Sequence, residues 1–502
     1  MRFHLKKVVR FVSLIILLFV LTQLLSYQEE VLSQINPTIN KKETTQSISA
    51  ENLNNNGIIN AKERSHCKDL EPINPMIRER FIFQKVSSKP DYLAFSAFYS
   101  DQPGDAYFLR IIGIGRYLNN RLDKSVPYPQ YCQLWFQKKD GNTVKVYNEV
   151  VPTVVQIMPE QKSKKYHPVL YLCYGPKNYK LKTVPYAVSL VDSKCKKPLN
   201  FLKVVNTKEE AKGKTQLDFG VCVTPFNFNY NKTLSFVENL EIQKMFGAQH
   251  FTFYNFSLSD KMKPVLNSYA SEGNISVIPW PLPPHLKVDI WPPNKKHVPN
   301  IFYFAQLGAL NDCLYRNMYR FKYLLFLDLD EIVVPRKDET WKEMIESAAK
   351  VKGFTKNATS YMFRNTFFRL DWGLLSDDSL SDKRIQLYHP YSLLSVNREK
   401  RIWNAGSRSK YMIVDAQCVS VVGVHQIWGY ISGKRCYKHK SMIMPINIGL
   451  LHHYRNWKKP EQKKHDAMIK DNNIFRFKDS IISRIEDRFK KITSQGQIEF
   501  IQ

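Results

Sequence analysis

Apolar residues between positions 219 and 335 follow two spacings in turn: the continuous or alternating runs of strands, and the three- and four-residue spacing of helices. Strands are predicted over residues 219–224, 249–254, 275–279 and 323–335, and helices over residues 233–246, 263–271 and 305–320. Strands that alternate with helices predict an α/β fold on a doubly wound, mostly parallel sheet. Because ligands of such sheets gather beyond the carboxyl ends of the strands, a binding site is expected there.

The N-terminal residues follow other patterns. Residues 11–25 are almost wholly apolar, with four basic residues before them and two glutamates soon after. This predicts a transmembrane signal anchor over residues 11–27, with residues 1–10 in the cytoplasm and the rest of the chain in the lumen. A cleaved signal peptide is the alternative, although no small-x-small cleavage site follows the apolar run. Residues 28–66 are polar and lack periodic apolar positions, which predicts a flexible stem.

Two further regions flank the predicted α/β domain, which we place at residues 216–456. Short β-type runs at residues 92–99, 106–112 and 131–136 are separated by turn-rich segments. They predict a β-rich accessory domain over residues 67–215. Residues 457–502 are predicted to form a basic, helical C-terminal tail.

The predicted strand at residues 323–335 carries three acids in an otherwise apolar stretch, Asp328, Asp330 and Glu331. Side chains two residues apart in a strand point to the same side, so the two aspartates are expected to converge on one point. Buried carboxylates repel each other and lose hydration, which a hard cation such as Mn²⁺ or Mg²⁺ would compensate. The other interpretation is a strand that runs into an acidic, solvated turn, but the apolar residues on both sides favour the cation site.

The cysteines and sequons agree with a luminal chain. Eight cysteines without a C-x-x-C pair allow up to four disulfides in an oxidising compartment. Cys222 lies inside an apolar run and could instead be a buried thiol. Sequons for N-glycosylation stand at Asn231, Asn274 and Asn357, and a fourth, at Asn255, falls in a strand-like run and is the least expected to be modified.

The net charge of +29 raises the question of nucleic acid. Basic residues are spread along the chain instead of forming one stripe, and no zinc-finger, RRM or helix-turn-helix pattern is present, so nucleic-acid binding is not expected. The charge favours anionic partners such as nucleotide diphosphates, acidic glycans or membrane surfaces. Walker and G-x-G-x-x-G loops are absent from the sequence as well.

Several separated motifs resemble one known family, glycosyltransferase family 92, in order and spacing. They are Phe219-Gly-Val-Cys-Val-Thr-Pro225, Phe246-Gly-Ala-Gln-His-Phe-Thr-Phe-Tyr-Asn255, Val277-Ile-Pro-Trp-Pro281, Asn311-Asp-Cys-Leu-Tyr-Arg316, Leu327-Asp-Leu-Asp-Glu331 and Leu451-His-His-Tyr-Arg455. The resemblance implies a GT-A fold and a type II membrane enzyme of the secretory pathway, placed in the Golgi membrane. It also implies inverting transfer of a sugar from a nucleotide diphosphate to a glycan hydroxyl, with galactose as the favoured sugar.

The resemblance further implies a metal site. Asp330, with Asp328 directly or through water, would hold Mn²⁺ or Mg²⁺ against the diphosphate of a UDP-sugar. A histidine from far downstream commonly joins such a site, with His453 as the first candidate and His425 as the second. For each histidine a hydrogen-bonded structural role is the alternative.

The remaining site residues are assigned on the same basis. A carboxylate after the metal motif would act as general base; Asp371, beside Trp372, is the first candidate, and Asp377 and Asp378 are its rivals. Glu331 is a second catalytic candidate, as an acid supporting the metal ligands or as a surface carboxylate.

The donor-binding candidates are four. Asp312 and Arg316 share a helical face, where they would orient the nucleotide or form a salt bridge. Pro225 and Asn255, at the ends of the first two strands of the α/β domain, would border the nucleoside. Trp280 would pack against sugar or fill the core, and the core is favoured.

The function predicted from the sequence is that of a metal-dependent inverting glycosyltransferase with a UDP-sugar donor and a glycan acceptor on glycoproteins or glycolipids. The alternative is a membrane-tethered, noncatalytic glycan-binding protein that keeps the fold. A sulfotransferase is disfavoured because no phosphosulfate-binding Gly-Lys-Thr/Ser loop precedes an early helix. A homo-oligomer is one of the states that the sequence allows.

Overall fold

A computed structural model describes residues 67–494 except 103–105, 119–120, 141–142, 161–163, 176–180, 182, 291–293, 295, 373–381, 432–435, 437–440 and 457–466. The predicted cytoplasmic tail, signal anchor and stem lie outside the described residues. Among the helices that are described, none is both long and apolar enough to cross a membrane. The described residues all belong to one compact unit, Glu63–Gln502.

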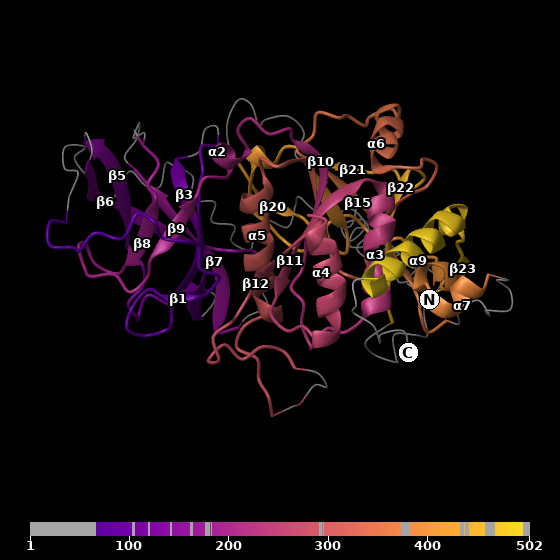
Figure 1. Ribbon diagram of the computed structural model, residues 1–502, viewed down its shortest axis with the longest axis horizontal. Helices are drawn as coiled ribbons and strands as arrows, with labels where there is room; N and C mark the ends of the chain where they lie inside the picture. The colour runs from indigo at the N-terminus through magenta and orange to yellow at the C-terminus, as the bar shows by residue number, and fades with distance from the viewer. Residues whose placement is uncertain are drawn as a thin grey trace, which may run out of the picture. The chain divides into compact units, whose positions relative to one another are not determined.

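The first nine strands form a barrel, drawn in indigo and purple in Figure 1. Their order is β1-β2-β9-β8-β5-β6-β7-β3-β4, and a further pairing between β2 and β3 closes the ring. Its interior is filled by apolar side chains. The strands are β1 (Gln84–Lys85), β2 (Leu93–Tyr99), β3 (Tyr107–Leu118), β4 (Arg121–Leu122), β5 (Tyr131–Asp140), β6 (Thr143–Ile157), β7 (Tyr166–Tyr174), β8 (Ala187–Val191) and β9 (Leu202–Val205).

A central sheet follows the barrel in sequence, after the short helix α2 (Thr207–Ala211). Its strand order is β12-β11-β10-β13-β18-β15-β21. Strands β10 to β13 pair in parallel, and β18 is antiparallel to both of its neighbours. The strands are β10 (Leu217–Val223), β11 (Ala248–Asn255), β12 (Ile275–Pro279), β13 (Phe321–Leu327), β15 (Ser360–Phe363), β18 (Lys410–Ile413) and β21 (Ser441–Ile443). The predicted α/β, mostly parallel sheet is thus confirmed.

Helices connect the parallel strands and cover both faces of the sheet. Helix α3 (Thr233–Phe246) joins β10 to β11, α4 (Lys263–Ser271) joins β11 to β12, and α5 (Gln306–Asn317) joins β12 to β13. The apolar residues of α3 and α4 pack into one core, and those of α5 pack into a second core on the other face. The chain therefore changes direction between β10 and β13, and the carboxyl ends of these two strands form a topological switch point.

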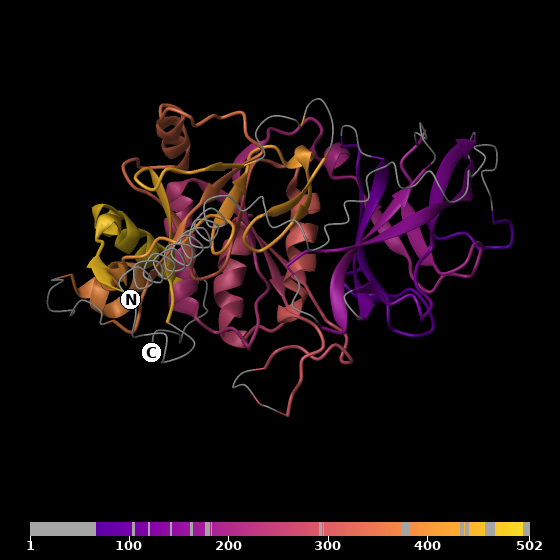
Figure 2. The ribbon, with the colours of Figure 1, turned by 180° about the vertical axis from the view of Figure 1, so that it is seen from behind.

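The barrel and the α/β part share a core. The second core contains residues of the barrel, such as Phe95 and Ile112, together with residues of α5, such as Leu310 and Leu314. Figure 2 shows α5 between the barrel and the sheet from behind. Helix α5 buries apolar side chains against both the barrel and the sheet, so the two parts pack directly against each other.

A second sheet carries the residues after the acidic motif. Its order is β14-β22-β16-β17-β23. The strands are β14 (Glu331–Pro335), β16 (Asn365–Phe368), β17 (Asn397–Glu399), β22 (Gly449–Tyr454) and β23 (Met468–Lys470). The continuous strand predicted over residues 323–335 was wrong, because it divides into β13 and β14, which belong to different sheets. Asp328 and Asp330 lie in the turn between them.

The remaining elements surround these sheets. Helix α6 (Trp341–Ala349) starts with a capping box in which Thr340 and Glu343 bond each other's backbone N–H groups. The others are α7 (Lys383–Tyr388), α8 (Tyr391–Leu394), the hairpin β19 (Val419–Val422) and β20 (Ile427–Tyr430), α9 (Lys478–Ser494), and the 3₁₀ turns η2 (Asp260–Met262), η3 (Tyr303–Ala305), η5 (Ala416–Cys418) and η8 (Asn473–Phe477).

The predicted C-terminal tail, residues 457–502, includes α9, which packs along α3 and α4. Arg488 of α9 donates to Glu241 at 3.0 Å and to Glu272 at 2.8 Å. Its apolar residues Ile481, Ile485 and Phe489 are buried in the same core as α3. Helix α9 is therefore part of the packed α/β unit.

All eight cysteines are paired. Cys222 was offered as a buried thiol, but it is bonded to Cys313 and ties β10 to α5. The other disulfides are Cys67–Cys195, Cys132–Cys173 and Cys418–Cys436. Two of the four lie within the barrel region and two in the α/β part.

Candidate active site

The acidic motif lies at the switch point of the central sheet. Thr224, which follows β10, donates from Oγ1 to Oδ1 of Asp328, which follows β13, at 3.0 Å. The two aspartates come together because a tight turn, not a strand, carries them: the N–H of Glu331 donates to the carbonyl oxygen of Asp328 at 3.2 Å. Both aspartates thus lie just beyond the carboxyl end of β13, but in a turn instead of on one side of a strand, and their convergence on one point stays a prediction.

A buried lysine that the sequence analysis missed compensates two of the three acids. Nζ of Lys410 lies 3.1 Å from Oδ2 of Asp328 and 3.3 Å from Oε2 of Glu331. Its side chain is only 1% exposed. Burial would lower the pKa of Lys410, but the two carboxylates raise that pKa above its ordinary value. The lysine is therefore a fixed positive charge directly behind the acidic turn.

His453 stands between the other two carboxylates. Its Nε2 lies 3.3 Å from Oδ2 of Asp330, and its Nδ1 lies 3.2 Å from Oε1 of Glu331. The pairing of β14 with β22 produces this geometry, because Glu331 and His453 are direct partners in the ladder. Nδ1 also lies 3.2 Å from the Asn365 side-chain amide, whereas Nε2 is buried without a hydrogen-bond partner.

Glu331 supports the site from behind. Its side chain is 1% exposed, and Oε2 accepts the N–H of Asp328 at 2.8 Å. Burial raises the pKa of Glu331 to about 7, although Lys410 opposes the shift. Because Glu331 is buried, the surface-carboxylate alternative is wrong, and its place behind Asp328 and His453 corresponds to the supporting acid.

Asp330 is the acid that faces outward. Its side chain is 42% exposed, in contrast to the buried Glu331. Burial of the carboxylate would raise its pKa, but His453 and Arg455 lower the pKa of Asp330 far below its usual range. Asp330 therefore presents a charged oxygen to anything that binds beside His453.

The second histidine candidate, His425, interacts electrostatically with Asp328. His425 is held through Nδ1, 3.3 Å from the carbonyl oxygen of Ser409. Burial and the charge of Lys410 lower its pKa to about 4, whereas Asp328 acts in the opposite direction. His425 is thus a neutral neighbour of the acidic turn, while His453 contacts Asp330 directly.

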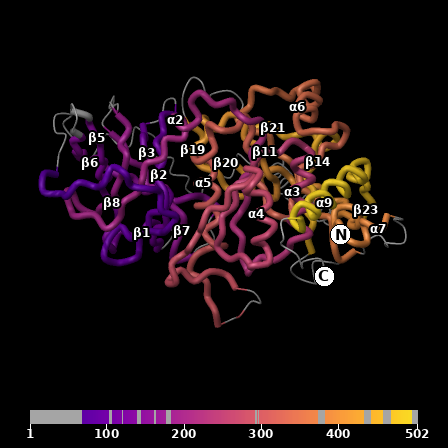
Figure 3. The backbone as a smooth tube through the Cα atoms, in the orientation of Figure 1, coloured from indigo at the N-terminus to yellow at the C-terminus, as the bar shows by residue number. Residues whose placement is uncertain are grey.

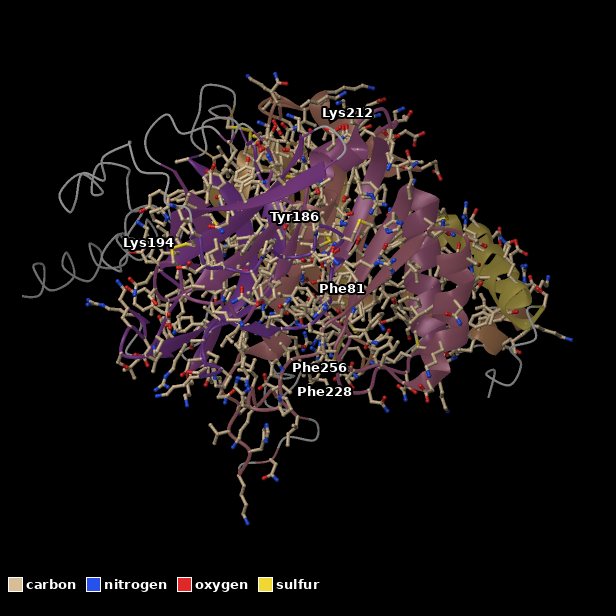
Figure 4. The ribbon with its side chains drawn as sticks, turned by 60° about the vertical axis from the view of Figure 1, so that its left-hand side comes forward. Phe81, Tyr186, Lys194, Lys212, Phe228 and Phe256 are labelled. Carbon is tan, nitrogen blue, oxygen red and sulfur yellow. A yellow bond between two sulfur atoms is a disulfide. The ribbon has the colours of Figure 1, made fainter. Side chains whose placement is uncertain are left out.

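The loops at the carboxyl ends of β10, β11 and β12 meet in an aromatic cluster. Phe228 and Phe256, labelled together in Figure 4, each lie 5.1 Å from Phe304 between ring centroids. Phe304 belongs to a turn in which Tyr303, Phe304 and Ala305 all have left-handed φ angles, of 40°, 57° and 56°. Such angles are costly for residues with a side chain, and they bring Tyr303 within electrostatic reach of Asp328 and Asp330.

Pro225 and Asn255 border the same edge. Pro225 follows Thr224, and Asn255 ends β11, where it forms an isolated bridge with Phe226. The carbonyl oxygen of Asn255 accepts the N–H of Trp280 at 2.9 Å. Their predicted contact with a nucleoside stays a prediction. Trp280 itself is fully buried and donates from Nε1 to the carbonyl oxygen of Phe304 at 3.0 Å, so it fills the core as favoured.

Asp312 and Arg316 do not face the site, which corrects their assignment to donor binding. Asp312 is fully buried and accepts hydrogen bonds from the hydroxyls of Tyr254 and Ser96, both at 2.5 Å. Arg316 lies 3.0 Å from Asp312 and 2.7 Å from Glu79. Ser96 belongs to barrel strand β2, so this network joins α5 to the barrel. The salt-bridge alternative at spacing i, i+4 was the right one.

We expect Arg316→Met to lower the free energy of unfolding by about 2–3 kcal/mol and to leave the KM for a nucleotide-sugar donor unchanged. Removing one partner of a buried ion pair is costly, but Tyr254 and Ser96 would still donate to Asp312, which limits the loss. Chemical denaturation and donor-dependent initial rates measure the two quantities. A raised donor KM with unchanged stability would return Arg316 to the donor site.

Asp371 lies beyond the end of β16, which runs parallel to β22. Phe367 is the ladder partner of His453, so the chain leaves β16 on the side where Asp330 is found. The carboxylate of Asp371 is 3.3 Å from Arg369 and 16% exposed. Its rivals Asp377 and Asp378 lie outside the described residues. The role of Asp371 as base stays a prediction.

The sequons differ in accessibility. Asn231 and Asn357 are exposed, whereas the Asn274 side chain is half-buried and accepts a hydrogen bond from Lys244 at 2.8 Å. Asn255 is half-buried at the end of a central strand. Glycosylation at Asn231, Asn274 and Asn357 stays a prediction.

Comparison with known families decides the relationship of this chain. The model described as "Glycosyltransferase family 92" matches residues 217–493, more than half of the chain. The chain belongs to glycosyltransferase family 92. The resemblance seen in the sequence motifs is thereby confirmed. The match runs from the start of β10 almost to the end of α9 and leaves the barrel outside it.

Two relatives in Caenorhabditis elegans show how far the similarity of this family 92 member extends. The β-1,4-galactosyltransferase galt-1 is 26% identical over 215 residues, which are 41% of this chain and 41% of that protein. The glycosyltransferase family 92 protein C33H5.2 is 29% identical over 137 residues, 27% of this chain and 26% of the relative. The chain thus matches less than half the length of either relative.

Two solved structures show weaker likeness. Staphylococcus aureus TarS 1–349 in complex with UDP-GlcNAc has a TM-score of 0.25 at 10% identity, over 50% of this chain and 62% of that one. GalNAc-T7 with UDP, GalNAc and Mn²⁺ has a TM-score of 0.27 at 12% identity, over 52% and 46%. At these scores the likeness does not establish a common fold.

Proposed function

We propose that this family 92 member is a metal-dependent inverting glycosyltransferase of GT-A organisation. It transfers a sugar, with galactose as the favoured one, from a UDP-sugar to a hydroxyl of a glycan. One observation carries the proposal: an exposed carboxylate, Asp330, lies 3.3 Å from a buried histidine nitrogen of His453 that has no hydrogen-bond partner. The membership in the family and the similarity to a β-1,4-galactosyltransferase support the reaction and the donor.

The residues present fit Mn²⁺ or Mg²⁺ bound by few protein ligands. Among the described residues, no three His, Cys, Asp or Glu side chains surround one point as a preformed metal centre would. Asp330 and Nε2 of His453 would hold the ion, and such ions commonly take further ligands from water and substrate phosphates. Glu331 and Asn365 flank Nδ1 of the imidazole, which fixes the ring and leaves Nε2 as the ligand nitrogen. When bound, the ion would neutralise charge on the departing diphosphate.

The chain's own residues supply the rest of the proposed chemistry. Lys410 and Thr224 contact both oxygens of the Asp328 carboxylate. Asp328 would therefore line the bottom of the donor site, and Asp330 would be the main carboxylate ligand of the ion. Arg455 acts electrostatically on Asp330 from the residue after β22, where it would also attract phosphate oxygens. Asp371 would remove the proton from the acceptor hydroxyl as sugar transfer proceeds.

The proposed setting is the lumen of the Golgi apparatus, with residues 11–27 as the anchor of a type II membrane protein. The glycan acceptor and the anionic donor are the expected partners, and nucleic acid is not. The basic composition would favour a donor with a diphosphate group.

The luminal part, purified as residues 28–502, tests the proposal directly. A screen of UDP-sugars against a panel of labelled N-glycans should show transfer from UDP-galactose, and an excess of EDTA should abolish it by removing the ion held by Asp330 and His453. Addition of Mn²⁺ should restore the rate. Transfer that persists in the chelator after dialysis would refute metal dependence, and no transfer from any UDP-sugar would refute the reaction.

A further inference from the structure

One residue of the barrel reaches into the α/β part beside the candidate site. Glu160 follows β6 with a left-handed φ of 66°. Its carboxylate accepts the backbone N–H groups of Val424 and of His425, the latter at 3.3 Å, and lies beside the indole of Trp428. A single half-buried carboxylate thus holds the turn of the β19–β20 hairpin, which packs beside α5 as Figure 3 shows.

Trp428 is anchored at one edge and exposed at the other. Trp428 is 40% exposed, although its indole nitrogen lies beside the carboxylate of Glu160. The fit around it is close: a Cβ atom added to Gly423 would lie 2.5 Å from Oε2 of Glu160 and 2.5 Å from Cδ1 of Trp428. A ring fixed in this way offers a rigid apolar face at little further cost in entropy when a ligand binds.

The hairpin is connected to the acidic turn by a short path. His425, three residues before Trp428, lies through Nδ1 3.3 Å from the carbonyl oxygen of Ser409, and the Ser409 hydroxyl donates back to the carbonyl oxygen of His425 at 2.9 Å. The next residue, Lys410, binds Asp328 and Glu331. The hairpin that carries the exposed indole is therefore hydrogen-bonded to the residue next to Lys410, which contacts the acidic turn.

We propose that Trp428, held by Glu160 of the barrel, is a stacking platform for a pyranose ring of the acceptor glycan. Sugar rings have an apolar face that packs on aromatic rings, and a platform beside the donor site suits the acceptor rather than the donor. The barrel, which lies outside the family match, then contributes to acceptor recognition through Glu160. This inference rests on the proposed glycosyltransferase activity.

The test compares acceptor and donor dependence in the luminal part with its barrel. Initial rates are measured with UDP-[³H]galactose and a panel of 2-aminobenzamide-labelled N-glycans, and UDP-galactose binding is measured separately by calorimetry. Trp428→Ala should raise the KM for the acceptor by about tenfold, equivalent to about 1.4 kcal/mol, and leave donor affinity unchanged. Trp428→Phe, which keeps an aromatic face, should recover most of that loss.

Two further variants address the anchor. Gly423→Ala, which displaces the ring, and Glu160→Gln, which weakens the contact beside it, should also raise the acceptor KM. Phe201→Ala removes an aromatic ring of similar exposure, 37%, from the barrel and serves as the control without effect. If the wild-type enzyme is active and Trp428→Ala leaves the acceptor KM unchanged, the stacking role of Trp428 is refuted and the proposed function is not. Wild-type protein that neither binds nor uses any UDP-sugar would overturn the proposed function and this inference together.

Discussion

Asp330→Asn is expected to reduce sugar transfer at least about a hundredfold while the protein folds normally. The substitution keeps the shape of the side chain and removes the charge that faces outward beside Nε2 of His453. If Asp330 holds the ion as proposed, its loss removes several kcal/mol of transition-state stabilisation, and each 1.36 kcal/mol is worth a factor of about ten in rate. Because the Asp330 side chain is 42% exposed, little change in melting temperature is expected.

The readouts are kcat/KM with saturating Mn²⁺ and Mn²⁺ binding by electron paramagnetic resonance or calorimetry. Asp218→Asn is the matched control: it removes the same charge from a side chain that is 41% exposed, in β10 at the opposite end of the strand from Thr224. That control should bind Mn²⁺ and transfer sugar like the wild type. Wild-type turnover and Mn²⁺ affinity in Asp330→Asn would show that the ion is held elsewhere.

The local elements of the α/β part were predictable because their signals are local. Helices α3 and α4 coincide with the predicted segments 233–246 and 263–271, where apolar spacing and sequence length agree. The position of Asp328 and Asp330 at a carboxyl edge follows from the same alternation of strands and helices. What the pattern could not provide was the break between β13 and β14, since both halves are equally apolar and only pairing to different sheets separates them.

Residues whose roles depend on distant contacts were missed or misassigned. Asp312 and Arg316 occupy one helical face, but only the barrel, through Ser96 and Glu79, determines that this face is turned away from the site. Lys410 is the first residue of the apolar strand β18, and its neighbours along the chain do not indicate that it contacts Asp328 in the acidic turn and Glu331 in β14. Glu160 is 264 positions from Val424, which it binds, and no motif marks it.

His453 shows the intermediate case. The sequence named it as the first histidine candidate because a histidine far downstream commonly completes such a site, and the β14–β22 ladder places it opposite Glu331 and beside Asp330. Its neighbour His452 points the other way, as alternation along a strand requires, and packs on Phe368 with 4.2 Å between ring centroids. Consecutive histidines in one strand thus have different surroundings.

Lys410→Met is expected to lower the free energy of unfolding by about 3–5 kcal/mol and to reduce transfer as well. Methionine keeps most of the side-chain volume, but Glu331, which is 1% exposed, would lose the nearest positive charge, and so would Asp328. A buried charge deprived of its partner costs more than the pair itself contributes. The surface pair Lys322 and Asp218, 2.6 Å apart with side chains 54% and 41% exposed, provides the control: Lys322→Met should leave the free energy of unfolding almost unchanged.

The double variant Lys410→Met with Glu331→Gln identifies the cause of that loss. If the uncompensated carboxylate of Glu331 is responsible, its neutralisation should restore part of the stability, so the double variant should be more stable than the sum of the two single changes predicts. Transfer should not return, because Asp328 would still lack the ammonium that holds it 3.1 Å away. Chemical denaturation of the four proteins completes the cycle. Additive losses would mean that Lys410 stabilises the fold by packing alone and that the acidic turn keeps its shape without it.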